Sequence, residues 1–237
     1  MNKLNGIIAV MVLLCCMTTD VSGQLKQKKV LNYQQHDHKV IHFGFCLGLN
    51  AMDFNVSPSL SDYRNDSLLS NVSELSPGFH IQAVSALRIT NNLELRFLPG
   101  VAFGSRALQF FKSGKLYDDH HQIESSYIEL PLLLKYKSVR VDNMRGFIIG
   151  GLNPRIDLAK TYHEDEGIYM DLKLNDLCYE MGGGFDFYFP YFKLTLEIRG
   201  SWGIFNILEE RSTPQPEFQN AINKLRSSVY LFSIYIE

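Results

Sequence analysis

Short and long connections alternate along this chain between segments whose apolar residues recur at every second position. Eight such segments can be read: Ile41–Phe54, Gly78–Ile89, Leu93–Phe103, Ser125–Lys137, Gly146–Leu158, Leu174–Phe189, Phe192–Phe205 and Ser228–Glu237. The short links are Asn91-Asn92, Val139–Met144 and Pro190-Tyr191, and the long ones are Asn55–Pro77, Gly104–Glu124, Ala159–Lys173 and Asn206–Ser227. A period of two predicts β-strands, and hairpins that close tightly at one end only are typical of membrane barrels. The sequence therefore predicts an all-β fold, an eight-stranded antiparallel up-and-down transmembrane β-barrel.

The two faces of these segments differ in a consistent way. In the first segment the large apolar face carries Ile41, Phe43, Phe45, Leu47 and Leu49. The small polar face carries His42, Gly44, Cys46, Gly48 and Asn50. A membrane barrel turns the apolar face towards lipid, whereas a soluble lipocalin-like barrel turns it inward around a ligand. The polar faces of later segments carry both signs of charge between glycines, which suits a narrow eight-stranded lumen. This favours the membrane barrel and leaves the soluble binder as an alternative.

Charged residues on the polar faces are predicted to fill the lumen as compensated pairs. They are Arg88, Glu94, Arg96, Glu129, Lys135, Glu180, Asp186, Lys193, Glu197 and Arg199. An unpaired buried charge is costly, so we expect a structural network here and no set of catalytic acids and bases. The fifth segment stays ambiguous, because Phe147 and Ile149 are as apolar as their neighbours Ile148 and Leu152.

The first hairpin and the prolines test this assignment. A three-residue loop, Thr90–Asn92, pairs Arg88 with Glu94 and sets apolar residues opposite each other on either side. A loop shorter by one residue would turn every side chain to the opposite face. Three prolines lie inside predicted strands of a closed barrel, where bulges or early strand ends are expected: Pro99, Pro131 and Pro154.

The first residues have the features of a secretory signal. An apolar run follows Lys3, and Val21-Ser22-Gly23 offers a small-residue cleavage site. We therefore predict a signal peptide over residues 1–23, a periplasmic extension over residues 24–40 and an outer-membrane barrel over residues 41–237. The mature chain would keep two cysteines, Cys46 and Cys178, on strands that are not neighbours, so both are expected to be free thiols facing the lumen.

Composition and motifs exclude several classes of function. The net charge of −2 gives no basic face for nucleic acid. Two clusters could suggest a metal site, Asp118-Asp119-His120-His121 and His36-Asp37-His38, but adjacent residues cannot readily converge on one tetrahedral centre. The chain has no G-x-S-x-G motif, phosphate-binding loop or nucleophile–base pair. We expect no catalytic residues, no metal and no cofactor.

Three stretches of the chain resemble PorT-type outer-membrane proteins. They are His42–Asn50 with Met52-Asp53-Phe54, then Tyr127–Lys137, and finally Gly182–Lys193. The first stretch is similar to the opening strand of that family, the second to its fourth strand, and the third to its sixth-to-seventh hairpin. The second motif is common to many barrels, whereas the first points more narrowly to PorT.

The resemblance implies an integral outer-membrane barrel required by type IX secretion, which exports cargo carrying a C-terminal sorting domain. It supplies no catalytic residues. Its expected partners are outer-membrane lipid and other secretion-system proteins, which would meet the long loops and the periplasmic tail. The alternative is a small structural or ligand-binding outer-membrane barrel without a secretion role. The chain ends on Glu237, whereas many outer-membrane barrels end on an aromatic residue.

Overall fold

The computed structural model describes residues 31–33, 39–58, 69–74, 76–112, 115–158, 173–208 and 222–237. The predicted signal peptide over residues 1–23 lies outside the described residues. So do His36-Asp37-His38 and most of the predicted loops Ala159–Lys173 and Asn206–Ser227. Within the described part of the chain, no helix is long and apolar enough to cross a membrane.

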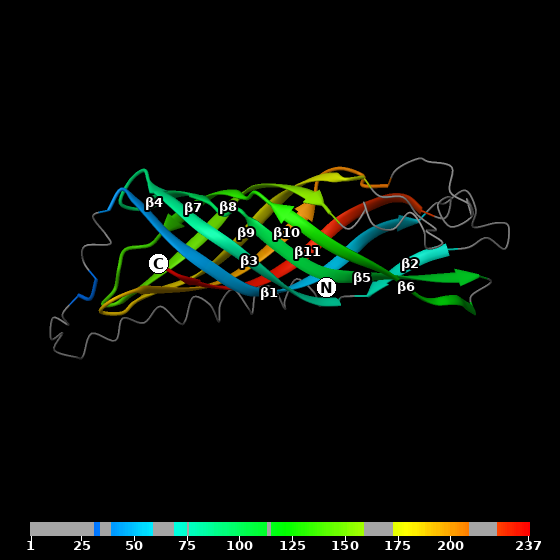
Figure 1. The fold of residues 1–237 in the computed structure, drawn as a ribbon, viewed down its shortest axis with the longest axis horizontal. Helices are drawn as coiled ribbons and strands as arrows, with labels where there is room; N and C mark the ends of the chain where they lie inside the picture. Colours follow the sequence, from blue (N-terminus) through cyan, green and yellow to red (C-terminus); the bar gives the residue numbers. More distant parts are fainter. Residues whose placement is uncertain are drawn as a thin grey trace, which may run out of the picture. The chain divides into compact units, whose positions relative to one another are not determined.

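Eleven strand segments form the wall (Figure 1). The first six are β1 (Ile41–Pro58), β2 (Leu69–Glu74), β3 (Ser76–Arg88), β4 (Leu93–Phe97), β5 (Gly100–Lys112) and β6 (Lys115–Glu129). The last five are β7 (Leu132–Lys137), β8 (Met144–Asp157), β9 (Asn175–Tyr188), β10 (Lys193–Gly203) and β11 (Ile222–Ile236). The pairs β2/β3, β4/β5 and β6/β7 each form one interrupted strand, because both members pair with the same neighbour.

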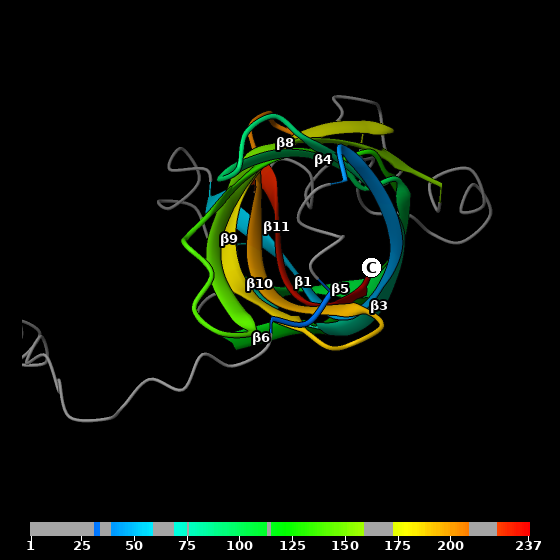
Figure 2. The ribbon, with the colours of Figure 1, turned by 90° about the vertical axis from the view of Figure 1, so that its left-hand side faces the viewer.

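These segments close into a ring of eight antiparallel strands (Figure 2). The order around the ring is β1, β2/β3, β4/β5, β6/β7, β8, β9, β10 and β11, and β11 pairs back with β1 from Phe45↔Ile236 to Pro58↔Ile222. Within the described residues each of the eight strands pairs with a neighbour on both sides, so the sheet closes on itself. The predicted eight-stranded antiparallel barrel is confirmed.

The prolines interrupt two strands in neighbouring positions. Pro99 separates β4 from β5, and Pro131 separates β6 from β7. Pro154 stays inside β8, and its carbonyl accepts the amide of Leu130 at 3.1 Å, next to the break at Pro131. Proline has no N–H to donate to a β-sheet. Each of these three prolines therefore lies beside a break in the hydrogen bonding of a neighbouring strand. The expected early strand ends are confirmed at Pro99 and Pro131.

Several strands run further than the sequence predicts. The prediction of a long loop over Gly104–Glu124 is wrong, because β5 and β6 continue as a hairpin to Lys112 and from Lys115. Likewise β1 extends to Pro58 and β11 begins at Ile222. The hydrophobic period marks only the part of a strand that lies against lipid, so a polar continuation beyond the membrane is read as a loop.

The two faces of the wall are assigned as predicted. On β1, the outward Phe43 is 71% exposed while the inward Cys46 is fully buried. On β8, Phe147 and Ile149 face the interior and Ile148 faces outward, which resolves the ambiguous fifth segment. The first hairpin has the predicted three-residue loop, with Arg88 opposite Glu94. An apolar exterior and a polar interior on the same strands are what a lipid-embedded barrel requires.

Candidate functional site

The lumen is filled by charged side chains that come from strands all around the ring. Nine of the predicted lumenal charges are buried, none of them more than 1% exposed: Glu94, Arg96, Glu129, Lys135, Glu180, Asp186, Lys193, Glu197 and Arg199. The tenth, Arg88, is half-buried at the end of β3. The predicted inward placement of these residues is confirmed, and the interactions below give the reason that they tolerate burial.

Glu180 on β9 is the centre of the network in the middle of the barrel. Its Oε1 accepts from Arg155 at 3.2 Å and from the side-chain amide of Asn153 at 2.7 Å. Its Oε2 lies 3.2 Å from Nε of Arg199. Arg155 also contacts Glu129 at 2.9 Å, so two acidic and two basic side chains alternate. Opposite charges at these distances compensate one another in a medium of low dielectric constant.

Some of these hydrogen bonds cross the lumen. Arg199 on β10 donates to Oε1 of Gln82 on β3 at 3.3 Å, although β11 and β1 stand between these strands in the ring. Gln82 in turn donates to Glu129 on β6 at 3.0 Å. The chain of contacts from β10 to β3 to β6 therefore ties three sides of the barrel together. Side chains from opposite sides of the wall therefore meet in the middle of the lumen.

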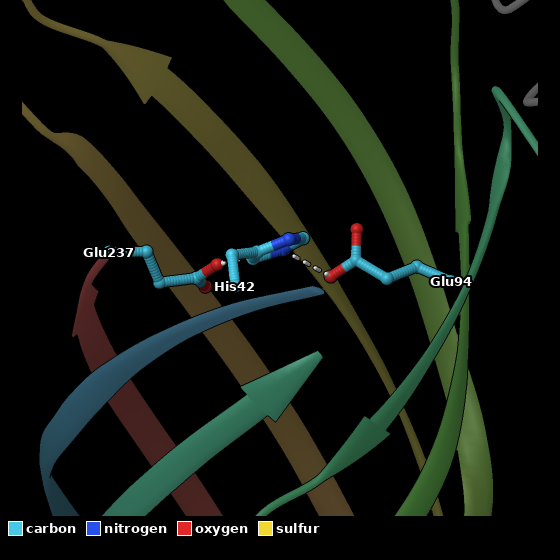
Figure 3. Close-up of side chains that lie close together, drawn as sticks. All are labelled: His42, Glu94 and Glu237. Carbon is cyan, nitrogen blue, oxygen red and sulfur yellow. Dashed lines mark hydrogen bonds and ion pairs between the residues drawn. The ribbon is translucent and has the colours of Figure 1, made fainter. Parts of the chain in front are cut away.

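At the short-turn end, His42 lies between two carboxylates, those of Glu94 and Glu237 (Figure 3). Its Nε2 is 3.2 Å from Oε1 of Glu94 and 3.3 Å from Oε2 of Glu237. The three side chains come from β1, from β4 and from the residue that follows β11. This cluster therefore connects the first strand of the barrel, β1, and the end of the last strand, β11, to β4.

The same cluster contains three potential metal ligands, but its carboxylates are already neutralised. One ligand atom from each of His42, Glu94 and Glu237 lies within 4.8 Å of the others. Glu94 accepts from Lys137 at 2.6 Å, Glu237 accepts from Lys193 at 2.7 Å, and Arg96 bonds both carboxylates. A divalent cation would have to enter beside three fixed positive charges. The arrangement therefore suits a set of ion pairs better than a metal site.

The adjoining part of the lumen holds a further buried ion pair and a cation–π contact. Nζ of Lys135 lies 2.7 Å from Oδ1 of Asp186, which also accepts from Thr195 at 2.6 Å. The same ammonium lies 3.7 Å from the centre of the Phe147 ring. The face of the Phe147 ring attracts this buried ammonium by a cation–π interaction. This contact explains why an aromatic residue points into a lumen that is lined with charges.

Towards the long-loop end, Arg106 on β5 is held by hydroxyl groups and an aromatic ring. Its guanidinium donates to Ser125, Ser227 and Tyr127, and it lies 4.2 Å from the centre of the Phe54 ring. Among the described residues, the carboxylate of Asp157 lies 3.8 Å from this guanidinium. A charge here rests on dipoles and π faces more than on an ion pair.

Sequence reasoning missed several members of the network. They are Arg106, Lys137, Arg155 and Glu237. Arg106 was assigned to a long loop, and Arg155 belongs to the ambiguous fifth segment. Glu237 was treated as an atypical chain end, yet it shares the inward parity of Ser233 and Tyr235. The predicted last segment, Ser228–Glu237, already includes this residue, and its period of two places it on the inward face with Tyr235.

The remaining predicted features divide between the described and the undescribed parts of the chain. Cys46 on β1 and Cys178 on β9 are free and buried, which confirms the prediction of unpaired thiols. Asp118-Asp119-His120-His121 lies in β6 and not in a loop, and the positions of its side chains are outside the described residues. His36-Asp37-His38 is likewise outside them.

Comparison with known proteins gives a family model and two solved structures to which this chain is similar. Residues 32–209 match the family model described as outer membrane protein beta-barrel domain. The crystal structure of the outer membrane protein OprG from Pseudomonas aeruginosa is 11% identical, over 83% of this chain and 92% of that chain, with a TM-score of 0.44. The solid-state NMR structure of the outer membrane protein AlkL in DMPC lipid bilayers is 12% identical, over 91% and 93%, with a TM-score of 0.39. No curated protein matches this chain.

Proposed function

This chain belongs to the outer membrane protein β-barrel domain family, and from that premise we propose that it is a non-conducting accessory or assembly component of type IX protein secretion. As a member of this family it lies in the outer membrane, where its apolar outer face contacts lipid. The secretion role rests on the likeness of His42–Asn50 and Met52-Asp53-Phe54 to the opening strand of PorT-type proteins. We also propose that the chain is not an enzyme.

The observation that carries the proposal is a set of hydrogen bonds that cross the lumen. Bonds between strands that are not neighbours, such as Arg199 to Gln82, cross the barrel, and the residues that make them are almost fully buried. An eight-stranded interior is just wide enough for its own side chains. A barrel of this kind acts through its outer surfaces, which makes an accessory role in protein export more suitable than passage of cargo.

The short-turn end supplies one of those surfaces. Asn32, before the barrel, donates from its amide to Asn143 at 2.9 Å and from its side chain to the carbonyl of Tyr188 at 3.2 Å. Arg140 donates to the carbonyl of Asn32 at 2.6 Å and lies 3.9 Å from the centre of the Tyr188 ring. The turn before β8 and the end of β9 thus hold the segment that leads into the barrel. We propose that this end, on the periplasmic side, is where secretion partners meet the barrel.

Deleting the gene and measuring export of cargo with a C-terminal sorting domain tests the secretion role. We expect export to fail and to be restored by the full-length chain. A variant with Arg140→Ala should restore it less well than a variant with Lys39→Ala, since Lys39 is an exposed cation at the same end without the contacts of Arg140. Normal export after deletion would contradict the proposal.

The lumen is tested separately by ion conductance in planar lipid bilayers. We expect the purified protein to insert without forming a steady pore, because the charges inside are paired across the lumen. A stable, reproducible conductance would contradict the non-conducting part of the proposal. It would leave the export experiment to decide the secretion role.

The alternative is a structural outer-membrane barrel without a secretion partner. The hydrogen bonds that cross the lumen favour this alternative too, because they join three sides of the barrel and would stabilise it mechanically. It predicts that deletion weakens the envelope, for example against detergent, while export of sorting-domain cargo continues.

A further inference from the structure

The outer wall carries an aromatic cluster near the long-loop end of β9, β10 and β11. The ring of Trp202 lies 5.4 Å from that of Tyr179 and 6.4 Å from that of Tyr230, the latter in a T-shaped contact. A Cβ atom at Gly200 would overlap with the Trp202 indole, so the glycine leaves the space in which the indole lies against the wall. Aromatic residues at this position mark the boundary between the hydrocarbon and headgroup regions of a bilayer.

Two cations follow the aromatic cluster on the same face of β11. Every second residue of this strand, from the short-turn end to the long-loop end, is Ile236, Ile234, Phe232, Tyr230, Ser228, Arg226 and Lys224, and all of them except Ser228 are exposed. Arg226 is four residues beyond Tyr230, which is about 13 Å along a strand. With a tilt of roughly 40° this is about 10 Å along the membrane normal. The order apolar, aromatic, cationic matches the order hydrocarbon, interface, phosphate in a membrane.

Arg226 is exposed, and it makes no hydrogen bond or ion pair within the described part of the chain. The nearest acidic residue on the outward face of β1 is Asp53, opposite Ser228 in the register. Oδ1 of Asp53 accepts the backbone amide of Phe54 at 2.7 Å. Among the described residues the guanidinium of Arg226 therefore has no counter-charge, whereas the lumenal Arg155 and Arg199 each contact carboxylates.

A groove of about 400 Å³ adjoins this guanidinium. It is lined by Asn55, Tyr179, Trp202, Gly203, Ile204, Arg226 and Ser227. These residues come from β1, β9, β10, β11 and the turn after β10, so the groove crosses the seam between the first and last strands. It combines one exposed cation with two aromatic rings.

We propose that this groove binds a phosphorylated lipid of the outer leaflet, with the lipid phosphate on Arg226 and the acyl chains along the apolar wall below Trp202. Charge complementarity favours a phosphate, since guanidinium groups bind phosphate oxygens in a bidentate manner. The height of Arg226 above the aromatic residues favours a lipid over a soluble ligand. This binding does not depend on a role in secretion.

Native mass spectrometry of the full-length protein in detergent, titrated with diphosphorylated lipid A, tests the proposal. We expect R226A to bind this lipid about fivefold more weakly than wild type, a factor that corresponds to the contribution of about 1 kcal/mol for one cation near a membrane surface. K39A removes the same charge at the opposite end of the barrel and should bind as wild type does. Lipid A without phosphate should bind wild type as weakly as the phosphorylated lipid binds R226A.

A second measurement separates the lipid from its headgroup. Trp202 is the only tryptophan of the chain, so its fluorescence reports directly on the groove. Lipid A should change the emission of wild type at lower concentration than that of R226A, and inorganic phosphate alone should not change it. Equal binding by wild type and R226A would overturn the proposal, as would inorganic phosphate binding with the affinity of the lipid. Heat-modifiable mobility of each variant verifies that it is folded.

Discussion

Two arginines on neighbouring strands occupy opposite environments. Arg199 on β10 is 1% exposed and contacts Glu180 at 3.2 Å, Glu197 at 3.5 Å and Gln82 at 3.3 Å. Arg226 on β11 is exposed and has no partner within the described residues. Inside the barrel the protein surrounds a charge such as Arg199 with its own carboxylates, because an uncompensated buried charge is costly. Outside, an unpaired cation at the membrane surface costs little and stays available for a ligand.

This difference separates residues that stabilise the barrel from residues that recognise something. A lumenal charge should affect the free energy of unfolding strongly and lipid binding weakly. An exterior charge should do the reverse. Four predictions below test this comparison, and urea unfolding in phospholipid vesicles, followed by the fluorescence of Trp202, measures all their variants on one scale.

The largest effect is expected for Glu180→Ala. Glu180 accepts hydrogen bonds from Arg155 and Asn153 and forms an ion pair with Arg199, so its removal leaves two buried guanidinium groups short of a counter-charge. Breaking a buried pair in this way costs about 3–5 kcal/mol. We expect the lower end of this range, because Arg155 keeps Glu129 and Arg199 keeps Glu197.

Glu180→Gln is the matched control for this prediction. The amide oxygen can still accept hydrogen bonds, so E180Q should lose less stability than E180A. If E180A unfolds within about 0.5 kcal/mol of wild type, the range of a neutral surface substitution, the lumenal charges are not what holds the barrel together.

The second effect compares glycines on the two faces. A Cβ at the inward Gly184 would overlap the carbonyl oxygen of Leu196 and lie 2.9 Å from Cζ of Phe147. A Cβ at the outward Gly150 would meet nothing closer than the carbonyl oxygen of Glu180, at 3.5 Å. Overpacking a filled interior costs about 1–3 kcal/mol. We therefore expect G184A to lose this amount in urea unfolding and G150A to unfold as wild type does; equal stability of the two variants would show that the lumen is loosely packed.

The division into two faces could be predicted from the sequence, because it depends only on a period of two and on charge. Ile41, Phe43 and Phe45 alternate with smaller residues, and a one-residue slip would expose every one of them to the lumen. The same rule placed Glu180, Asp186 and Arg199 inside. Their pairing partners could not be predicted, since contacts across the lumen join strands that are far apart in the sequence, such as Arg199 with Gln82.

The long-loop end could not be predicted for a different physical reason. Once a strand leaves the membrane, its outer face no longer has to be apolar, and the pattern that identifies it disappears. This explains why β5 and β6 were underestimated and why Arg106 was assigned to a loop. The groove at Arg226 was missed for the same reason, because it lies beyond the predicted start of the last strand at Ser228.

A smaller effect is expected at the turn that keeps the two faces in register. Oγ1 of Thr90 accepts the amide of Leu93 at 3.0 Å and that of Asn92 at 3.3 Å, which holds the three-residue loop between β3 and β4. Thr90→Ala removes both bonds at an exposed site and should cost about 1 kcal/mol in urea unfolding. T90S keeps the hydroxyl and should retain most of that stability. Loss of the same amount in both variants would assign the effect to the methyl group instead.

The smallest effect on stability is expected for the exterior arginine, which makes it the sharpest test of the comparison. Arg226→Ala removes no hydrogen bond or ion pair that the structure describes, so the free energy of unfolding should stay within about 0.5 kcal/mol of wild type in vesicles of neutral phospholipid. Arg199→Ala, one strand away, should cost several times more, because it leaves Glu180 and Glu197 with less counter-charge. If the two arginines destabilised the barrel equally, the distinction between an internal structural charge and an external binding charge would fail. Lipid A should raise the free energy of unfolding of wild type more than that of R226A, because a ligand stabilises the folded protein that binds it. That difference would show that the exterior cation acts through its ligand.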